Sequence, residues 1–321
     1  MAKTLLEVEG LKKYFPVKSG IFKRTVGFVH AVDDVSLSVS ERETFALVGE
    51  SGCGKSTTGR SILRILEPTE GKVIFDGEDI LSCSTEQMRK KRKDMQLIFQ
   101  NPYSSLNPRM TVRMLLSEPL ETHFNLSSKE VQDKVVWMLE EVGLAREHLD
   151  RYPHQFSGGQ RQRISIARAL ITEPRFVVAD EPVSALDVSI QSQILNLLMK
   201  LQRDMNLTYV FISHDLNVVR HISSNVGVMY LGQIVEKGET ENLYERPLHP
   251  YTKALLSAVP SKDPLNKKKR IILQGDVPSP VNPPKGCPFH LRCDKIFEPC
   301  SSSRPELKEV ETGHHVACHL Y

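Results

Sequence analysis

Short apolar runs alternate with segments of helical periodicity through the first three quarters of the chain. Residues 44–48, 176–179 and 209–213 are almost wholly apolar, which predicts strands buried on both faces. Residues 29–39 alternate between apolar and polar positions, which predicts a strand with one exposed face. Residues 190–201 carry apolar residues at helical spacing. This order of elements predicts an α/β fold.

Glycine, proline and capping residues mark the ends of further elements. Residues 55–66 predict a helix that ends before a proline, and residues 127–143 predict one that opens with a capping box and ends at a glycine. The basic, glycine-containing stretch 16–27 and the proline-containing stretch 101–108 predict surface loops.

The sequence GESGCGKST lies between a predicted buried strand and a predicted helix. Its glycines let the backbone turn so that several N–H groups face one anion, and the helix start adds positive partial charge. Lys55 can reach the β and γ phosphates, and the Ser56 hydroxyl can bind Mg²⁺. We therefore predict a nucleoside triphosphate site, the alternative being a glycine-rich turn that matches by chance. The candidate residues are Gly49, Glu50, Ser51, Gly52, Cys53, Gly54, Lys55, Ser56 and Thr57.

A second glycine motif, FSGGQRQR, also opens a predicted helix. Its backbone N–H groups and helix dipole can again bind an anion. One chain thus has one triphosphate loop but two such helix starts, which suggests that the second meets a phosphate bound to another subunit. The candidate residues are Ser157, Gly158, Gly159 and Gln160.

Polar side chains follow three predicted strands. Asp180 suits Mg²⁺, directly or through water, and Glu181 is placed to polarise a water that attacks the γ phosphate. The alternative is two surface carboxylates at a strand end. Gln100 can reach Mg²⁺ or the attacking water, and His214 can hydrogen-bond the γ phosphate, although a lone histidine is more often structural.

Tyr14 and Phe15 place two aromatic rings ahead of the glycine loop. Such a ring can stack on a nucleobase, although the residues alone favour a core aromatic on a strand.

Composition and charge narrow the class of protein. The 321 residues are 40% hydrophobic and 25% charged, as in soluble globular proteins, and the net charge of +3 does not point to nucleic acid. The start of the chain shows no secretory signal, and no apolar run approaches bilayer length, so we expect membrane association only through a partner or a surface patch.

Four of the six cysteines lie near the end of the chain, at Cys287, Cys293, Cys300 and Cys318. Without an export signal, metal binding competes with disulfides as their explanation. Their spacing matches neither a standard zinc ribbon nor a tight ferredoxin run. The preceding basic stretch 263–270 predicts a solvated connector, with contact to anionic lipid or a partner as the alternative.

Together these motifs resemble the ATP-binding subunits of ABC transporters over about residues 4–240. GESGCGKST resembles the Walker A motif, Gln100 the Q-loop, FSGGQRQR the ABC signature, FVVADEP the Walker B strand with its catalytic glutamate, SALD the D-loop and His214 the switch histidine. The resemblance implies an ABC-type P-loop ATPase core (RecA-like) with an antiparallel β subdomain and a helical subdomain at about 101–170. It ranks Phe15 before Tyr14 for base stacking.

The stretches IFQNPYSSLNPRMTV and RPLHPYTKALLSAVP and the cysteine tail resemble the oligopeptide/dipeptide importer branch. This implies an ATPase domain at 1–245 and an extension at 246–321, in a peripheral subunit on the cytoplasmic face of the membrane that hydrolyses ATP to power peptide import. It also implies a head-to-tail partner ATPase, commonly a different chain, two transmembrane permease subunits and an external solute-binding protein, but no nucleic acid. ATP would lie between the Walker A motif of one ATPase and residues 157–160 of the other.

Related importer ATPases carry a [4Fe-4S] cluster in this tail, so the resemblance implies Cys287, Cys293, Cys300 and Cys318 as ligands in a structural role. Zinc, with His290 or His319 as substitute ligands, is the second interpretation, and unliganded thiols are the third.

Three other functions stay open. They are an importer for another solute such as oligosaccharide or nickel, a soluble ABC protein acting on DNA or ribosomes, and a regulatory nucleotide-binding module without turnover.

Overall fold

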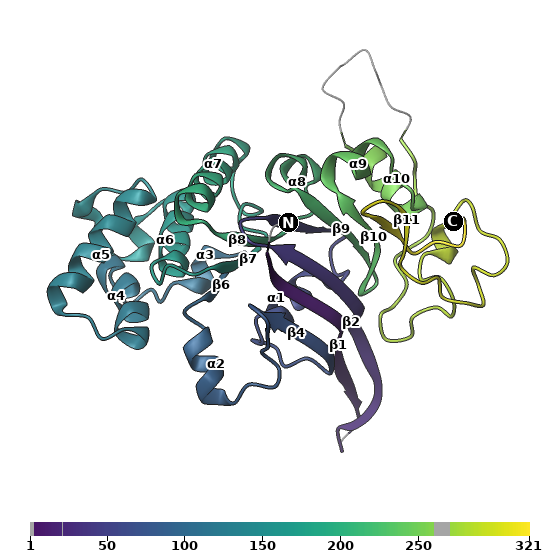
Figure 1. Ribbon diagram of the computed structural model, residues 1–321, viewed down its shortest axis with the longest axis horizontal. Helices are drawn as coiled ribbons and strands as arrows, with labels where there is room; N and C mark the ends of the chain where they lie inside the picture. Colours follow the sequence, from purple (N-terminus) through teal and green to yellow (C-terminus); the bar gives the residue numbers. More distant parts are fainter. Residues whose placement is uncertain (1–2, 21, 260–269) are drawn as a thin grey trace, which may run out of the picture. The chain divides into compact units, whose positions relative to one another are not determined.

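A computed structural model describes residues 3–20, 22–259 and 270–321 (Figure 1). The chain divides into two compact units, which we treat separately. The helix-rich unit consists mainly of Ser82–Phe211, and the strand-rich unit consists of Thr4–Val39, Thr44–Leu81 and Ile212–Tyr321. The predicted connector at 263–270 lies outside the described residues except for Arg270. The domain boundary at residue 245 stays a prediction.

The strand-rich unit contains an antiparallel sheet in the order β2-β1-β4-β5. Its strands are β1 (Thr4–Ser19), β2 (Arg24–Ser40), β4 (Glu70–Phe75) and β5 (Glu78–Asp79). The prediction of a loop at 16–27 is therefore wrong for most of that stretch, because β1 and β2 extend through it (Figure 1). The backbones of paired strands satisfy each other's hydrogen bonds, so polar side chains can point to solvent without ending the strand.

Five further strands of this unit lie in the order β11-β12-β10-β9-β3. They are β3 (Thr44–Val48), β9 (Asn225–Tyr230), β10 (Gln233–Glu239), β11 (Lys308–Glu311) and β12 (His314–Val316). β3 is buried throughout, as predicted, and runs parallel to β9. Near the C-terminus, β12 pairs antiparallel with β10, with Val316 opposite Glu236, so the end of the chain is built into the sheet.

The helices of the strand-rich unit are short. They are α1 (Lys55–Ile62), α8 (Leu216–Ile222), α9 (Thr240–Glu245), α10 (Pro250–Ser257) and the 3-10 turn η3 (His290–Arg292). α1 ends four residues before the predicted position at 66. Arg64 has a left-handed backbone (φ +51°) and its guanidinium donates to the Ile80 carbonyl at 2.9 Å, which turns the chain away from the helix axis.

In the helix-rich unit, three strands lie in the order β8-β7-β6. They are β6 (Met95–Ile98), β7 (Phe176–Asp180) and β8 (Thr208–Ile212). β6 and β7 are parallel and pair from Met95 opposite Phe176 to Ile98 opposite Ala179. Their carboxyl ends therefore meet at one edge, where the chain continues to Gln100 and Glu181.

The helices of this unit are α2 (Thr85–Lys91), α3 (Pro102–Ser105), α4 (Val112–His123), α5 (Ser128–Glu141), α6 (Gly158–Leu170) and α7 (Val188–Met205), with 3-10 turns η1 (Arg146–His148) and η2 (Pro153–Gln155). The capping box before α5 is confirmed, since the Ser127 and Glu130 side chains accept from each other's backbone N–H at 3.4 and 2.8 Å. The prediction of a loop over 101–108 is wrong at α3, because Pro102 stands at the first helical position, where no N–H is needed.

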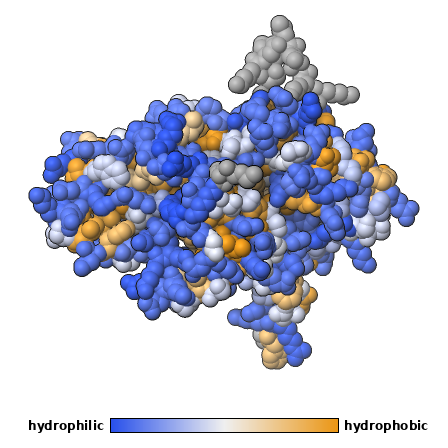
Figure 2. All heavy atoms as spheres, in the orientation of Figure 1, coloured by the Kyte–Doolittle hydropathy of each residue, from blue (hydrophilic) through white to orange (hydrophobic). Residues whose placement is uncertain are grey.

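The face drawn in Figure 2 carries mainly hydrophilic side chains with scattered apolar ones. Among the described residues, no helix is both long enough and apolar enough to cross a bilayer.

Candidate functional site

The loop of residues 49–57 joins β3 to α1, and two of its glycines are sterically required. A Cβ on Gly49 would lie 2.3 Å from the Met229 carbonyl oxygen, and one on Gly54 would lie 2.1 Å from that of Ala31. Their φ angles, +150° and +108°, are ones that residues with a side chain rarely adopt. The glycines thus let the loop pack against its own unit while its backbone turns.

Lys55 lies at the start of α1 and is 4% exposed. Its ammonium donates to the carbonyl oxygens of Gly49 at 2.8 Å and Glu50 at 3.0 Å, so it points back across the loop. A buried lysine amine at a helix start, inside a glycine-rich turn, is the donor set that suits a polyphosphate. Burial raises the pKa of the neighbouring Cys53 thiol, which keeps that side chain neutral. The residues present therefore fit a nucleoside triphosphate.

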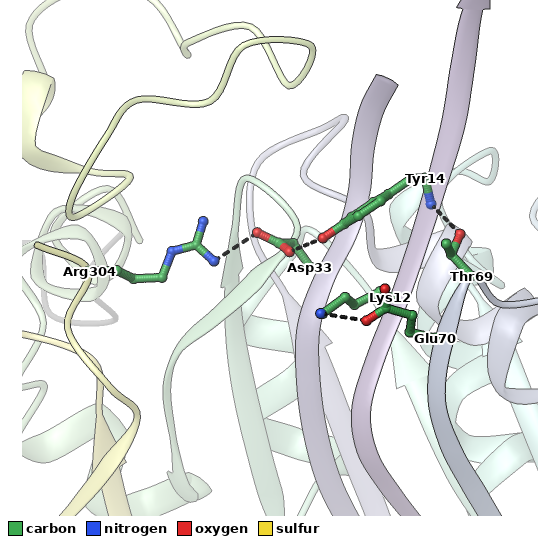
Figure 3. A network of polar contacts seen from close by, with 6 residues as sticks. All are labelled: Lys12, Tyr14, Asp33, Thr69, Glu70 and Arg304. Carbon is green, nitrogen blue, oxygen red and sulfur yellow. Dashed lines mark hydrogen bonds and ion pairs between the residues drawn. The ribbon is translucent and has the colours of Figure 1, made fainter. Parts of the chain in front are cut away.

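The two candidate aromatic residues lie on β1. The Tyr14 hydroxyl donates to Asp33 at 2.5 Å (Figure 3). The Tyr14 ring packs on His30 at 4.2 Å between centroids. Burial and the hydrogen bond to Asp33 raise the pKa of Tyr14. The Phe15 ring makes no hydrogen bond, and the Lys13 ammonium lies over it, 5.0 Å from the ring centre. The Tyr14 side chain is thus held in place by its hydrogen bond to Asp33, whereas the Phe15 ring has no polar group that could hold it in this way.

In the helix-rich unit, the ends of β6 and β7 bring two of the predicted catalytic residues together. The Gln100 amide donates to the Glu181 carboxylate at 2.8 Å. Asp180 is the last residue of β7 and is fully buried. Glu181 has a left-handed backbone (φ +46°), which is uncommon for a residue with a side chain and is held by the turn in which Ser184 donates to its carbonyl.

The second glycine motif forms the N-terminus of α6. Ser157 Oγ accepts from the Gln160 N–H at 3.3 Å, and the Gln160 side chain accepts from the Ser157 N–H at 3.1 Å. A Cβ on Gly159 would lie 2.6 Å from the side chain of Ile190, so glycine is needed there for α6 to pack on α7. The structure confirms the predicted helix start with small residues.

His214 is exposed and lies in the strand-rich unit between β8 and α8, beside Asp215, which caps α8. The candidate residues are therefore divided between the two units. Residues 14, 15, 49–57 and 214 belong to the strand-rich unit, and residues 100, 157–160, 180 and 181 belong to the helix-rich unit. The combined magnesium set of Ser56, Gln100 and Asp180 stays a prediction.

The four tail cysteines lie close enough together for their charges to influence one another. Burial, with a smaller electrostatic contribution from the other three thiols, raises the pKa of Cys287 to about 11. Within the described ranges, no three His, Cys, Asp or Glu side chains are grouped so that they could hold a metal ion. The ligand geometry expected at Cys287, Cys293, Cys300 and Cys318 is thus not found among these residues, and the metal site stays a prediction.

Two residues near the glycine loop were missed by the sequence analysis. The Tyr251 hydroxyl accepts from the Glu50 N–H at 2.9 Å, and Arg292 pairs with the Glu50 carboxylate. Both lie inside stretches that carried the family resemblance, HPYTK and HLRC, but nothing in those stretches alone indicates a partner some two hundred residues earlier in the chain.

Comparison with known proteins adds family information to this geometry. A family described as "ABC transporter" matches residues 32–184, and one described as "Oligopeptide/dipeptide transporter, C-terminal region" matches residues 235–300. The oligopeptide transport ATP-binding protein AppF of Bacillus subtilis (strain 168) is 55% identical over 99% of this chain and 98% of its own length. The dipeptide transport ATP-binding protein DppF of Escherichia coli (strain K12) is 50% identical over 99% of this chain and 95% of its own.

Among solved structures, the ATP-binding cassette MJ0796, in a dimeric post-hydrolysis state bound to ADP and Pi, is similar with a TM-score of 0.66 and 29% identity. The match covers 74% of this chain and 99% of the cassette. The predicted P-loop ATPase fold with an antiparallel β subdomain is thereby confirmed.

Proposed function

Because the chain belongs to the ATP-binding subunits of oligopeptide and dipeptide ABC transporters, we propose that it hydrolyses ATP to power the uptake of di- or oligopeptides across a membrane. The observation that carries the proposal is the glycine loop, in which the buried Lys55 amine turns back onto the loop carbonyls. AppF and DppF, to which the chain is similar over nearly its whole length, are named for oligopeptide and dipeptide transport.

In this proposal each candidate residue has a chemical role. The loop N–H groups and Lys55 bind the phosphates, and the Phe15 ring stacks on the base, with Tyr14 as the alternative. Mg²⁺, which neutralises phosphate charge, would be held by Ser56, Gln100 and Asp180.

Glu181 accepts a proton from the attacking water, and the Gln100 amide orients that carboxylate through the 2.8 Å hydrogen bond. His214 donates a hydrogen bond to the γ phosphate.

We propose that the ATPase works as a head-to-tail pair, with residues 157–160 of a partner chain facing the bound nucleotide. The well-capped N-terminus of α6 supports this arrangement, as does the similarity to a cassette that is dimeric with ADP and Pi. The partner is a second, commonly non-identical ATPase. The pair lies beneath two permease subunits on the cytoplasmic face of the membrane, and an external solute-binding protein supplies the peptide.

We further propose that residues 246–321 form an extension whose four cysteines hold a [4Fe-4S] cluster, with zinc and His290 or His319 as the alternative. The proximity of two of the four supports this proposal, since the Cys287 N–H donates to the Cys300 carbonyl at 2.9 Å. The cluster would have a structural role, fixing a segment with little core of its own.

The experiment is to measure ATP hydrolysis by the full chain, assembled with its transporter partners, for wild type and Glu181→Gln. We expect kcat to fall by about 10²–10⁴-fold while ATP binding is retained, because only the proton acceptor is removed. Glu173→Gln is a matched control, since Glu173 also has a left-handed backbone (φ +54°) but pairs with Lys134 on the surface of the helix-rich unit. Equal rates for wild type and Glu181→Gln would refute the catalytic assignment.

A further inference from the structure

Glu50, the second residue of the glycine loop, is held at four atoms. Its carboxylate receives two hydrogen bonds from the Arg292 guanidinium, at 2.8 and 3.2 Å. Its N–H donates to the Tyr251 hydroxyl at 2.9 Å, and its carbonyl accepts from the Lys55 ammonium at 3.0 Å. The second residue of the loop is therefore fixed from outside the loop by two residues of the C-terminal third of the chain.

Arg292 is itself rigidly placed. It ends the turn η3, next to Cys293, and its side chain is 8% exposed. Its guanidinium lies 5.9 Å from the centre of the Tyr230 ring, and that ring packs edge-on against Tyr251 and Phe289 at 4.8 and 5.3 Å. A planar guanidinium that packs on an aromatic ring and binds one carboxylate through its two terminal nitrogens has little freedom to move.

A second arginine of the same segment, Arg304, pairs with Asp33 on β2. Arg304 donates to Asp33 at 2.9 Å, and Asp33 also accepts from the Tyr14 hydroxyl (Figure 3). Asp33 accepts a third hydrogen bond from Gln233 at 3.0 Å. The Asp33 side chain is only 7% exposed, so its charge depends on these partners. The cysteine-bearing segment thus contacts the glycine loop directly and reaches Tyr14, one of the two candidate base-stacking residues, through Asp33.

We propose that the C-terminal segment is a working part of the nucleotide site and that Arg292 is its main positioning residue. This inference rests on the proposed ATPase function. The Gly49 and Glu50 carbonyls orient the Lys55 ammonium. Because Arg292 holds the Glu50 carboxylate, it also fixes the position of that ammonium before a phosphate binds. Without the Arg292–Glu50 contact, ATP binding would have to order the loop, and this cost would lower the affinity for ATP.

The test uses Arg292→Lys in the full chain assembled with its transporter partners. Lysine keeps the charge but cannot make the bidentate contact. We expect the KM for ATP to rise about tenfold, with a smaller change in kcat and with a matching loss of affinity for a fluorescent ATP analogue.

Arg220→Lys is the matched control. Arg220 makes a comparable two-nitrogen contact with Glu241, at 3.2 and 2.6 Å, in the same unit, but that pair involves no residue of the glycine loop. We expect Arg220→Lys to leave the KM for ATP unchanged.

Glu50→Gln tests the same contact from the loop side and covers the case in which Arg292→Lys fails to fold. If Arg292 acts through Glu50, Arg292→Lys adds little to the KM in the Glu50→Gln background. An unchanged KM in Arg292→Lys, or additive effects in the double variant, would overturn the inference. Its failure would differ from failure of the ATPase proposal, in which wild type and Glu181→Gln would hydrolyse ATP equally.

Discussion

We predict that the strand-rich unit loses stability as the pH falls, because its buried His249 must then take up a proton. His249 caps α10, with its Nδ1 accepting from the Tyr251 N–H at 3.1 Å, and it is 1% exposed. Burial lowers its pKa from 6.5 to about 4, although Glu236 opposes the shift and Lys253 adds slightly to it. A proton on Nδ1 would break the cap and place a cation among the rings around Phe289.

The sign and size of the effect follow from these two pKa values. The folded state resists protonation, so below pH 6.5 the unfolded state takes up the proton first, and stability falls as the pH falls towards 4. At pH 5 the loss is about 2 kcal/mol, and at pH 7 it is about 0.2 kcal/mol. The local opening constant should therefore rise about 20-fold between pH 7 and pH 5 from this histidine alone.

Hydrogen exchange of the amides in α9 and α10 measures that opening. The control is His249→Asn, because asparagine is a good helix N-cap and does not titrate in this range. Wild-type protection, corrected for intrinsic exchange rates, should fall about 20-fold more than that of the variant between the two pH values. The same pH dependence in both proteins would refute the assignment of the step to His249.

Two further predictions concern the glycine loop and the cysteines. Gly54→Ala should abolish binding of a fluorescent ATP analogue, because its Cβ would lie 2.1 Å from a backbone oxygen. Gly52→Ala introduces backbone strain at φ +80° but places its Cβ within 4 Å of no atom beyond its chain neighbours, so it should weaken binding less, and equal losses would contradict the steric argument. Anaerobically purified protein should contain about four iron and four sulfide per chain, lost in Cys300→Ala but kept in Cys83→Ala, and stoichiometric zinc without iron would contradict the cluster assignment.

Local sequence signals predicted most of what lies within single elements. The buried run at 44–48, the capping box before α5 and the helix start at Ser157 are all found, because each depends on residues a few positions apart. The same reasoning failed where pairing between distant segments decided the backbone. Residues 16–27 look like a polar loop, yet most of them belong to the long strands β1 and β2, because each strand supplies the hydrogen bonds that the other needs.

The sequence by itself determined the chemistry of this protein, because each motif of glycines, carboxylates or amides is a run of adjacent residues that can be read without the fold. Only the tertiary structure decided which groups hold them in place. Arg292 and Glu50 are 242 positions apart, and Arg304 and Asp33 are 271 apart. A contact between such distant residues leaves no pattern in either segment, because it depends on how the sheet brings the two ends of the chain together.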